Sequence, residues 1–125
     1  MCELAAKIQD AELEVMRVLW EAGEPLPLIE IRRILAERTE WEDPTIKTLL
    51  RRLHTKGIVK LERRGVYSAV VTEREYCDWS TNVFLNKLYH GSAKHLVASL
   101  FSGGKLDDKD IEELRAMFHV EESHE

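Results

Sequence analysis

One predicted helix carries the side chains of this sequence that are best suited to chemistry. It begins at Asp43-Pro44, an N-cap followed by proline at the first helical position, and it ends at Gly57. At about 100° per residue, its apolar residues gather on one face: Ile46, Leu49, Leu50 and Leu53. The other face carries cationic and hydroxyl side chains: Thr45, Lys47, Thr48, Arg51, Arg52 and Thr55. Arginine can donate two hydrogen bonds to guanine, and threonine can contact a thymine methyl group or a phosphate. This face therefore has the chemistry to bind a DNA major groove.

Four further basic residues follow along the chain. Lys56 and Lys60 fit phosphate contacts, and Arg63 and Arg64 lie in a predicted turn, where arginine suits phosphate or the minor groove. Residues 44–71 hold seven Lys and Arg against one Glu, a net of +6, in a chain whose net charge is −5. The alternative interpretation is a charged surface that only keeps a helix and a hairpin soluble. Because the positive charge coincides with a structural motif, we favour DNA binding.

The helices and strands predicted around these residues indicate a winged helix. They are a helix between Asp10 and Gly23, a helix that starts at Pro27 and stops before residues 38–42, and strands at 58–62 and 66–71. The two strands flank the Arg63-Arg64-Gly65 turn. Three helices followed by a basic hairpin are the winged helix-turn-helix arrangement. We therefore expect a mainly α fold with a small β-hairpin and a C-terminal helical region.

The C-terminal region begins with a capping box, Thr72 to Glu75, which predicts the start of a new helix. That helix ends near Gly91, a short helix follows up to Gly103-Gly104, and a last helix opens at Asp107. These patterns predict two domains. Residues 1–72 would form the winged-helix DNA-binding domain, and residues 73–125 a helical dimerisation domain.

The dimerisation expectation rests on apolar side chains that a short tail cannot bury alone. Six of the nine aromatic residues lie beyond residue 72, and three helices in so short a segment form a marginal core. Burial against a second copy is the simplest solution, since closed two-fold dimers are the commonest oligomers. The candidate interface residues are Tyr76, Trp79, Val83, Phe84, Leu88, Leu96, Leu100, Phe101, Ile111 and Leu114. Two alternatives are packing back onto the winged helix and binding of a coenzyme or drug by the aromatic cluster.

Several classes of protein are disfavoured by what the sequence lacks. No apolar run approaches a membrane span, and the first residues do not form a signal peptide. Two cysteines, Cys2 and Cys77, suit a reducing cytosol, so we expect a cytoplasmic protein. The cysteines and five histidines lack metal-ligand spacing, and no nucleophile or phosphate-binding motif is present. We therefore expect no metal, no other cofactor and no enzymatic activity.

Several segments resemble the BlaI/MecI/CopY family of penicillinase and methicillin-resistance repressors. They are IQDAELEVMRVLW at residues 8–20, Trp41, TIKTLLRRL at residues 45–53, Lys56-Gly57 and DIEELR at residues 110–115. The likeness covers nearly the whole chain in order. It implies a winged-helix repressor that binds inverted-repeat operators in double-stranded DNA as a homodimer. In the drug-resistance branch it also implies a membrane sensor with a cytoplasmic zinc protease, which triggers cleavage of the repressor in its dimerisation region.

The sequence departs from that family at three places. No cysteine follows Cys77, so the paired C-x-C motifs of the copper branch are absent. The cleaved Asn-Phe of the drug-resistance branch aligns with Leu100-Phe101, which is the candidate cleavage position here. The third helix starts with Glu42-Asp43-Pro44 in place of Ser-Pro-Lys, and the wing is a residue or two shorter. We therefore expect an operator preference that differs from that of the best-known members. We expect a dimeric repressor released by an unidentified signal. The alternative is a winged-helix module whose basic face binds an acidic protein.

Overall fold

The computed structural model describes the backbone of residues 3–122 and the side chains of residues 3–119. Cys2 therefore lies outside the described residues. The chain forms two compact units, Met1–Thr81 and Asn82–Glu125. Within the described residues, no helix combines the length and the apolar character needed to cross a membrane.

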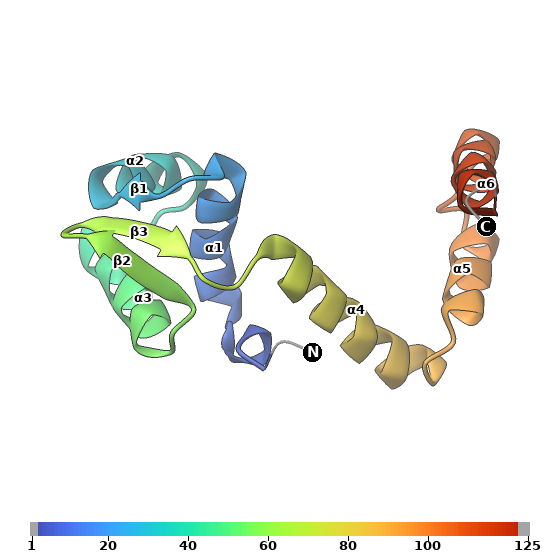
Figure 1. The fold of residues 1–125 in the computed structure, drawn as a ribbon, viewed down its shortest axis with the longest axis horizontal. Coiled ribbons are helices and arrows are strands. Elements are labelled where there is room, and N and C mark those ends of the chain that lie inside the picture. The colour runs from blue at the N-terminus through green and yellow to red at the C-terminus, as the bar shows by residue number, and fades with distance from the viewer. Residues whose placement is uncertain (1–2, 123–125) are drawn as a thin grey trace. The chain divides into compact units, whose positions relative to one another are not determined.

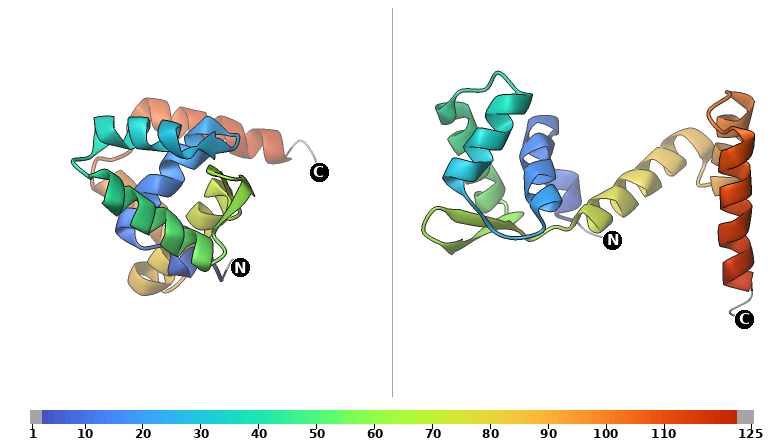
Figure 2. Two further views of the ribbon diagram at one scale, coloured as in Figure 1. Left: turned by 90° about the vertical axis from the view of Figure 1, so that its left-hand side faces the viewer. Right: turned by 90° about the horizontal axis from the view of Figure 1, so that it is seen from above.

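The first unit contains the predicted three helices and hairpin (Figure 1). Its elements are η1 (Ala5–Lys7), α1 (Asp10–Ala22), β1 (Leu26–Pro27), α2 (Leu28–Arg38), α3 (Asp43–Thr55), β2 (Val59–Arg63), β3 (Val66–Ala69) and the start of α4 (Glu73–Tyr89). The helix α1 contacts both α2 and α3, and a short loop joins α2 to α3 (Figure 2). The hairpin of β2 and β3 follows directly on α3.

Local signals set the ends of these helices. A capping box closes the start of α1, where the Gln9 N–H donates to the Glu12 carboxylate at 2.9 Å. Gly23 ends α1 in the left-handed conformation, with φ of 67°. The helix α3 begins one residue earlier than predicted, since Glu42 is its N-cap and Asp43 is already helical. Pro44 still lies in the first turn, where its missing N–H costs no helical hydrogen bond.

The sheet has three antiparallel strands in the order β1-β3-β2, one more than predicted. Leu26 of β1 pairs with Tyr67, and Leu61 of β2 pairs with the same residue from the other side. Pro27 belongs to β1 and caps α2, so the second helix starts at Leu28 and not at Pro27. A two-residue strand that contains proline has no alternating pattern, which is why the sequence did not reveal β1.

The core of the first unit lies between the three helices and one face of the sheet. Its fully buried large side chains are Val15, Met16, Val18, Ile31, Leu35, Ile46, Leu50, Leu53, Ile58, Val59 and Val71, together with the polar residue Glu12. The four apolar residues predicted for one face of α3 are all buried here. Burial of that face turns the opposite face of α3 outward.

An aromatic cluster attaches the start of α4 to the first unit. The Trp20 indole N–H donates to the Val71 carbonyl at 2.9 Å, and its ring lies 5.8 Å from that of Tyr76. The Trp79 ring follows at 6.0 Å from Tyr76. Because these side chains pack on the core, the compact unit extends to Thr81, beyond the domain boundary expected at residue 72.

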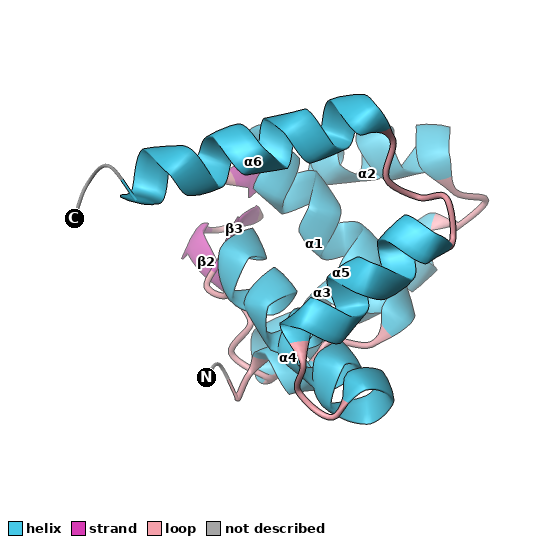
Figure 3. Ribbon diagram, turned by 90° about the vertical axis from the view of Figure 1, so that its right-hand side faces the viewer, coloured by secondary structure: helices cyan, strands magenta, loops and turns pink. Residues whose placement is uncertain are grey.

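In the described part of the second unit, the regular elements are helices joined by short loops: the end of α4, α5 (Ala93–Ser102) and α6 (Asp108–Glu122) (Figure 3). Among its described residues no side chain is fully buried. Its large apolar residues that are more than two-fifths exposed are Val83, Phe84, Leu88, Val97, Phe101, Met117 and Phe118. This unit therefore has no closed core within the described part of a single chain.

Candidate nucleic-acid interface

The exposed face of α3 carries the side chains that the sequence singled out. Thr45, Lys47, Arg51, Arg52 and Thr55 are exposed, and Thr48 is half-buried. By helical geometry, Thr48, Arg51 and Thr55 lie nearly opposite the buried side, with Lys47 and Arg52 flanking them. These five polar side chains form a continuous outward surface on one rigid element.

An ion pair positions the start of α3. Arg32 of α2 donates a hydrogen bond to the Asp43 carboxylate in the first turn of α3. This hydrogen bond, together with the charges of Arg32 and Lys47, holds the pKa of Asp43 below its usual value. The same contact raises the pKa of Arg32. The anion also lies where the helix dipole favours negative charge, so the pair ties α2 to the amino end of α3.

The tip of the hairpin carries two exposed arginines. Arg63 and Arg64 precede Gly65, whose φ of 74° is a conformation that suits glycine. The Leu28 N–H donates to the Gly65 carbonyl at 2.7 Å, which fixes the turn to the start of α2. The hairpin therefore holds both arginines at a defined place beside the three helices.

Glu62 is the single acidic residue of the basic block, residues 44–71. Its carboxylate accepts a hydrogen bond from the Ser68 hydroxyl at 2.7 Å, and Lys60 lies 3.5 Å away. The Ser68 hydrogen bond, then the charge of Lys60, lowers the pKa of Glu62. The Lys60 side chain remains 60% exposed, so this surface pair leaves its ammonium accessible.

The remaining cations of the block are not neutralised by direct ion pairs. Within the described part of the chain, none of Lys47, Arg51, Arg52, Arg63 and Arg64 has a carboxylate within 4.0 Å. Basic side chains without internal partners are available to an external anion. With Lys60, they form an exposed basic surface over α3 and the hairpin.

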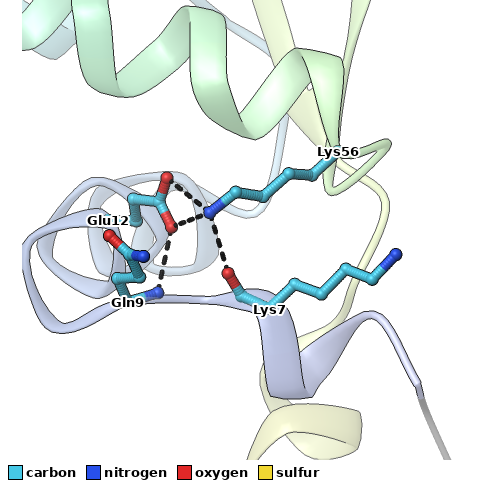
Figure 4. Close-up of polar contacts among 4 residues, drawn as sticks. All are labelled: Lys7, Gln9, Glu12 and Lys56. Atoms are coloured by element: carbon cyan, nitrogen blue, oxygen red, sulfur yellow. Dashed lines mark hydrogen bonds and ion pairs between the residues drawn. The ribbon is translucent and has the colours of Figure 1, made fainter.

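Lys56 is different from the other predicted phosphate contacts. Its ammonium lies within the first unit, 2.6 Å from one oxygen of Glu12 and 2.9 Å from the other (Figure 4). Its side chain is only 25% exposed, and that of Glu12 is 0% exposed. The structure therefore turns Lys56 inward, because a buried carboxylate requires a compensating charge. The spacing of Gln9 and Glu12 indicates a capping box, in which the Glu12 side chain turns toward the Gln9 N–H. No local sequence signal indicates that Lys56, 44 residues away, is the second partner of Glu12.

The predicted interface residues of the tail fall into three groups. Tyr76 and Trp79 already have partners in the first unit. Val83, Phe84, Leu88 and Phe101 are exposed, while Leu96, Leu100, Ile111 and Leu114 are half-buried. A groove of about 670 Å³ runs between α5 and α6, and its apolar lining includes Val97, Phe101, Leu106, Ile111, Leu114 and Phe118.

Two other predictions concern single sites. The candidate cleavage position, Leu100-Phe101, lies inside α5, and Phe101 is 59% exposed. Among the described residues, no group of three His, Cys, Asp or Glu side chains is placed to hold a metal ion. Cys77 is exposed and forms no disulfide.

The three helices, the short sheet and the helical tail define a winged helix-turn-helix protein with an appended helical region. This class is confirmed by the solved structure of the DNA-binding domain of the repressor BlaI, which has 34% identity and a TM-score of 0.52. The match covers 61% of this chain and 94% of that domain.

The family model for penicillinase repressors matches residues 8–119, and the chain belongs to that family. The penicillinase repressor of Staphylococcus aureus is 35% identical over 92% of this chain and 93% of its own length. The penicillinase repressor of Bacillus licheniformis is 31% identical over 94% and 91%. The methicillin resistance regulatory protein MecI of Mammaliicoccus sciuri is 31% identical over 87% and 90%. These relatives are regulators and not enzymes, and they confirm the family resemblance inferred from the sequence.

Proposed function

We propose that this chain is a transcriptional repressor that binds an inverted-repeat operator in double-stranded DNA as a homodimer. The observation that carries the proposal is the outer face of α3. It combines threonine side chains with arginine and lysine side chains, and these cations have no ion-pair partner among the described residues. The opposite face of the helix is buried. The relatives that bear the names of repressors support the same function.

In this mechanism α3 lies in the major groove. Arg51, with Thr48 and Thr55 on the same line of the helix, contacts base edges, where arginine can donate two hydrogen bonds to guanine. Lys60, Arg63 and Arg64 contact the sugar-phosphate backbone from the hairpin and fix the orientation of the protein. Repression follows from occupancy, because a bound operator excludes other proteins. No chemical step is needed.

The tail supplies the contact with the second copy. Phe84 and Leu88 on α4 and Phe101 on α5 are 44%, 55% and 59% exposed in the single chain, and the α5–α6 groove is apolar. Burial of this surface against the same surface of a partner removes it from water. Two joined DNA-binding units then bind two half-sites, and the second contact benefits from a high effective concentration.

We further propose that cleavage of the repressor releases the operator, as in the drug-resistance branch. Cleavage between Leu100 and Phe101 would separate α6 and part of the α5–α6 groove from the DNA-binding unit. The peptide is helical, and the Lys105 N–H donates to the Leu100 carbonyl at 2.9 Å. A protease needs extended backbone, so α5 must open first. The membrane sensor pathway is the proposed source of that signal, and penicillinase or methicillin-resistance genes are the proposed targets.

An electrophoretic mobility shift experiment tests the DNA-binding proposal. The probe is the DNA upstream of the chain's own coding sequence, and the control is a mixed-sequence duplex of equal length. At physiological salt, we expect the upstream DNA to bind at least about 10³-fold more tightly. Equal affinity for both duplexes would contradict sequence-specific repression. Absence of binding to either would favour the protein-interaction alternative.

A further inference from the structure

The cluster around Glu12 joins two consecutive segments near the amino end of the chain to the end of α3, 44 residues away in sequence. The Glu12 carboxylate accepts from the Gln9 N–H at 2.9 Å and from the Lys56 ammonium at 2.6 Å and 2.9 Å. The same ammonium donates to the Lys7 carbonyl at 2.9 Å. Figure 4 shows the Lys56 side chain reaching toward Glu12, whereas the Lys7 side chain points away from the cluster. The cluster thus links η1, the start of α1 and the end of α3.

The Lys56 ammonium is engaged by three acceptor atoms of this cluster. An ammonium group has three donors, and the structure supplies three acceptor atoms: two Glu12 oxygens and the Lys7 carbonyl. The positive charge is compensated by a carboxylate that is 0% exposed. A DNA phosphate would have to compete with this buried carboxylate for the Lys56 ammonium. Lys56 therefore differs from Lys60, whose side chain is 60% exposed.

Lys56 lies where α3 ends and the hairpin begins. Lys56 is the C-cap of α3, and its N–H donates to the Arg52 carbonyl at 3.0 Å. Gly57 follows with φ of 81°, and then Ile58 and Val59 are buried as β2 begins. The pair lies at the junction between the helix that carries the basic face and the hairpin that carries the basic tip.

We propose that Glu12 and Lys56 form a positioning pair that fixes the end of α3 and the start of the hairpin against α1, and that Lys56 itself contacts no phosphate. The proposal rests on the proposed DNA-binding function. It predicts that loss of the pair weakens discrimination between DNA sequences, because base contacts require α3 and the hairpin in a fixed relation. It also predicts that the number of released counterions does not change.

The variant that tests this is Glu12→Gln with Lys56→Met in the full chain. Lys56→Met alone leaves a buried carboxylate without compensation and is expected to destabilise the fold. In the double variant no charge is buried, and the amide oxygen introduced at position 12 can still accept from the Gln9 N–H. The matched control is Glu14→Gln with Arg17→Met, an exposed pair on the same helix at 3.6 Å. It makes equivalent substitutions away from the cluster.

Binding is measured by fluorescence anisotropy against the upstream DNA and a mixed-sequence duplex, across a range of salt concentrations. For the double variant, we expect the preference for upstream DNA to fall by about fivefold or more, the lower range of one lost base contact. The slope of log affinity against log salt should equal that of the wild type. Lys60→Met should reduce the magnitude of the slope by about two, because the homodimer loses one phosphate contact in each half-site. The control pair should change neither quantity.

Two results would overturn the proposal. A slope reduced by about two in the double variant would show that Lys56 contacts a phosphate in each half-site. An unchanged slope with unchanged preference would show that the pair does not position the DNA-binding elements. If the wild type does not prefer its upstream DNA, the proposed function fails, and the positioning role is decided by amide exchange. The Ile58 N–H, which donates to the Leu53 carbonyl at 2.9 Å, should then exchange faster in the double variant than in the control. Equal exchange would overturn the role.

Discussion

Replacing Arg51 with alanine should weaken operator binding without weakening the fold. Arg51 is exposed on α3, and among the described residues it has no carboxylate within 4.0 Å. Its removal therefore breaks no ion pair and opens no cavity in the core. Surface substitutions of this kind change the free energy of unfolding by about 0.5 kcal/mol or less. Any large effect on DNA binding must then come from the lost contact with DNA.

The size of that effect follows from the proposed two-fold assembly. A bidentate arginine–guanine contact contributes about 1–3 kcal/mol of discrimination. A homodimer makes the contact once in each half-site, so operator binding should lose about 2–6 kcal/mol. This corresponds to a loss of about 30-fold to about 10⁴-fold in affinity. Binding to mixed-sequence DNA should change much less, because it depends mainly on phosphate contacts.

The assay is fluorescence anisotropy with the upstream DNA and with single base-pair substitutions of it. Arg51→Ala should lose preference at one base pair in each half-site. Arg51→Lys is the informative companion, since it keeps the charge but cannot form the planar two-donor contact. We expect Arg51→Lys to keep the salt dependence of the wild type and to lose the base preference. Full base preference in Arg51→Lys would refute base reading by Arg51 and leave it as a phosphate contact.

Three further predictions follow from the contacts described above. Phe84→Asp places a charge in the proposed apolar interface, so it should raise the dimer dissociation constant at least about thirtyfold in sedimentation experiments. The control Asn82→Asp, on the opposite side of α4, should leave the dissociation constant unchanged. Trp20→Phe keeps the aromatic packing but removes the donor to the Val71 carbonyl, so it should lower the free energy of unfolding in urea by about 1 kcal/mol; an unchanged value would show that this hydrogen bond adds no stability. Arg32 lowers the pKa of Asp43, so the stability that this pair contributes is present above the unfolded pKa of the carboxyl and is lost as the pH falls through its lower folded pKa. Asp43→Asn should flatten this acid dependence in thermal unfolding, and an unchanged pH profile would contradict the assignment.

The elements with local signals were predictable from the sequence. The third helix was identified by Asp43-Pro44 at its start and Gly57 at its end, and the four apolar residues between them are buried as expected. The capping box at Thr72 is also confirmed, since the Glu75 N–H donates to the Thr72 hydroxyl at 3.1 Å. Such features depend on neighbours within one or two turns, so the sequence contains all the information they need.

Features that depend on distant partners were not predictable in the same way. The strand β1 forms only because Leu26 and Pro27 lie beside β3. The inward direction of Lys56 requires the buried Glu12 of another helix, and a basic residue in a basic block otherwise indicates an external contact. Likewise, Tyr76 has helical spacing with the apolar residues of the tail, yet it packs on Trp20. Periodicity predicts which side of a helix is apolar, but it does not predict what covers that side.

The distribution of charge explains why dimerisation and DNA binding are coupled in the proposed function. The chain is net negative, with −5 overall, and its excess of positive charge lies in residues 44–71, which form α3 and the hairpin. One of the seven basic residues of that block, Lys56, is used internally against Glu12. Only the other basic residues of the block are available to DNA phosphates. Because each phosphate contact releases about one counterion, this limits the affinity of a single copy for DNA at physiological salt. In the proposed function, tight occupancy depends on two copies bound together, so the α5–α6 region would control repression through dimerisation. A signal that separates the copies, such as cleavage at Leu100-Phe101, would be sufficient to release the operator.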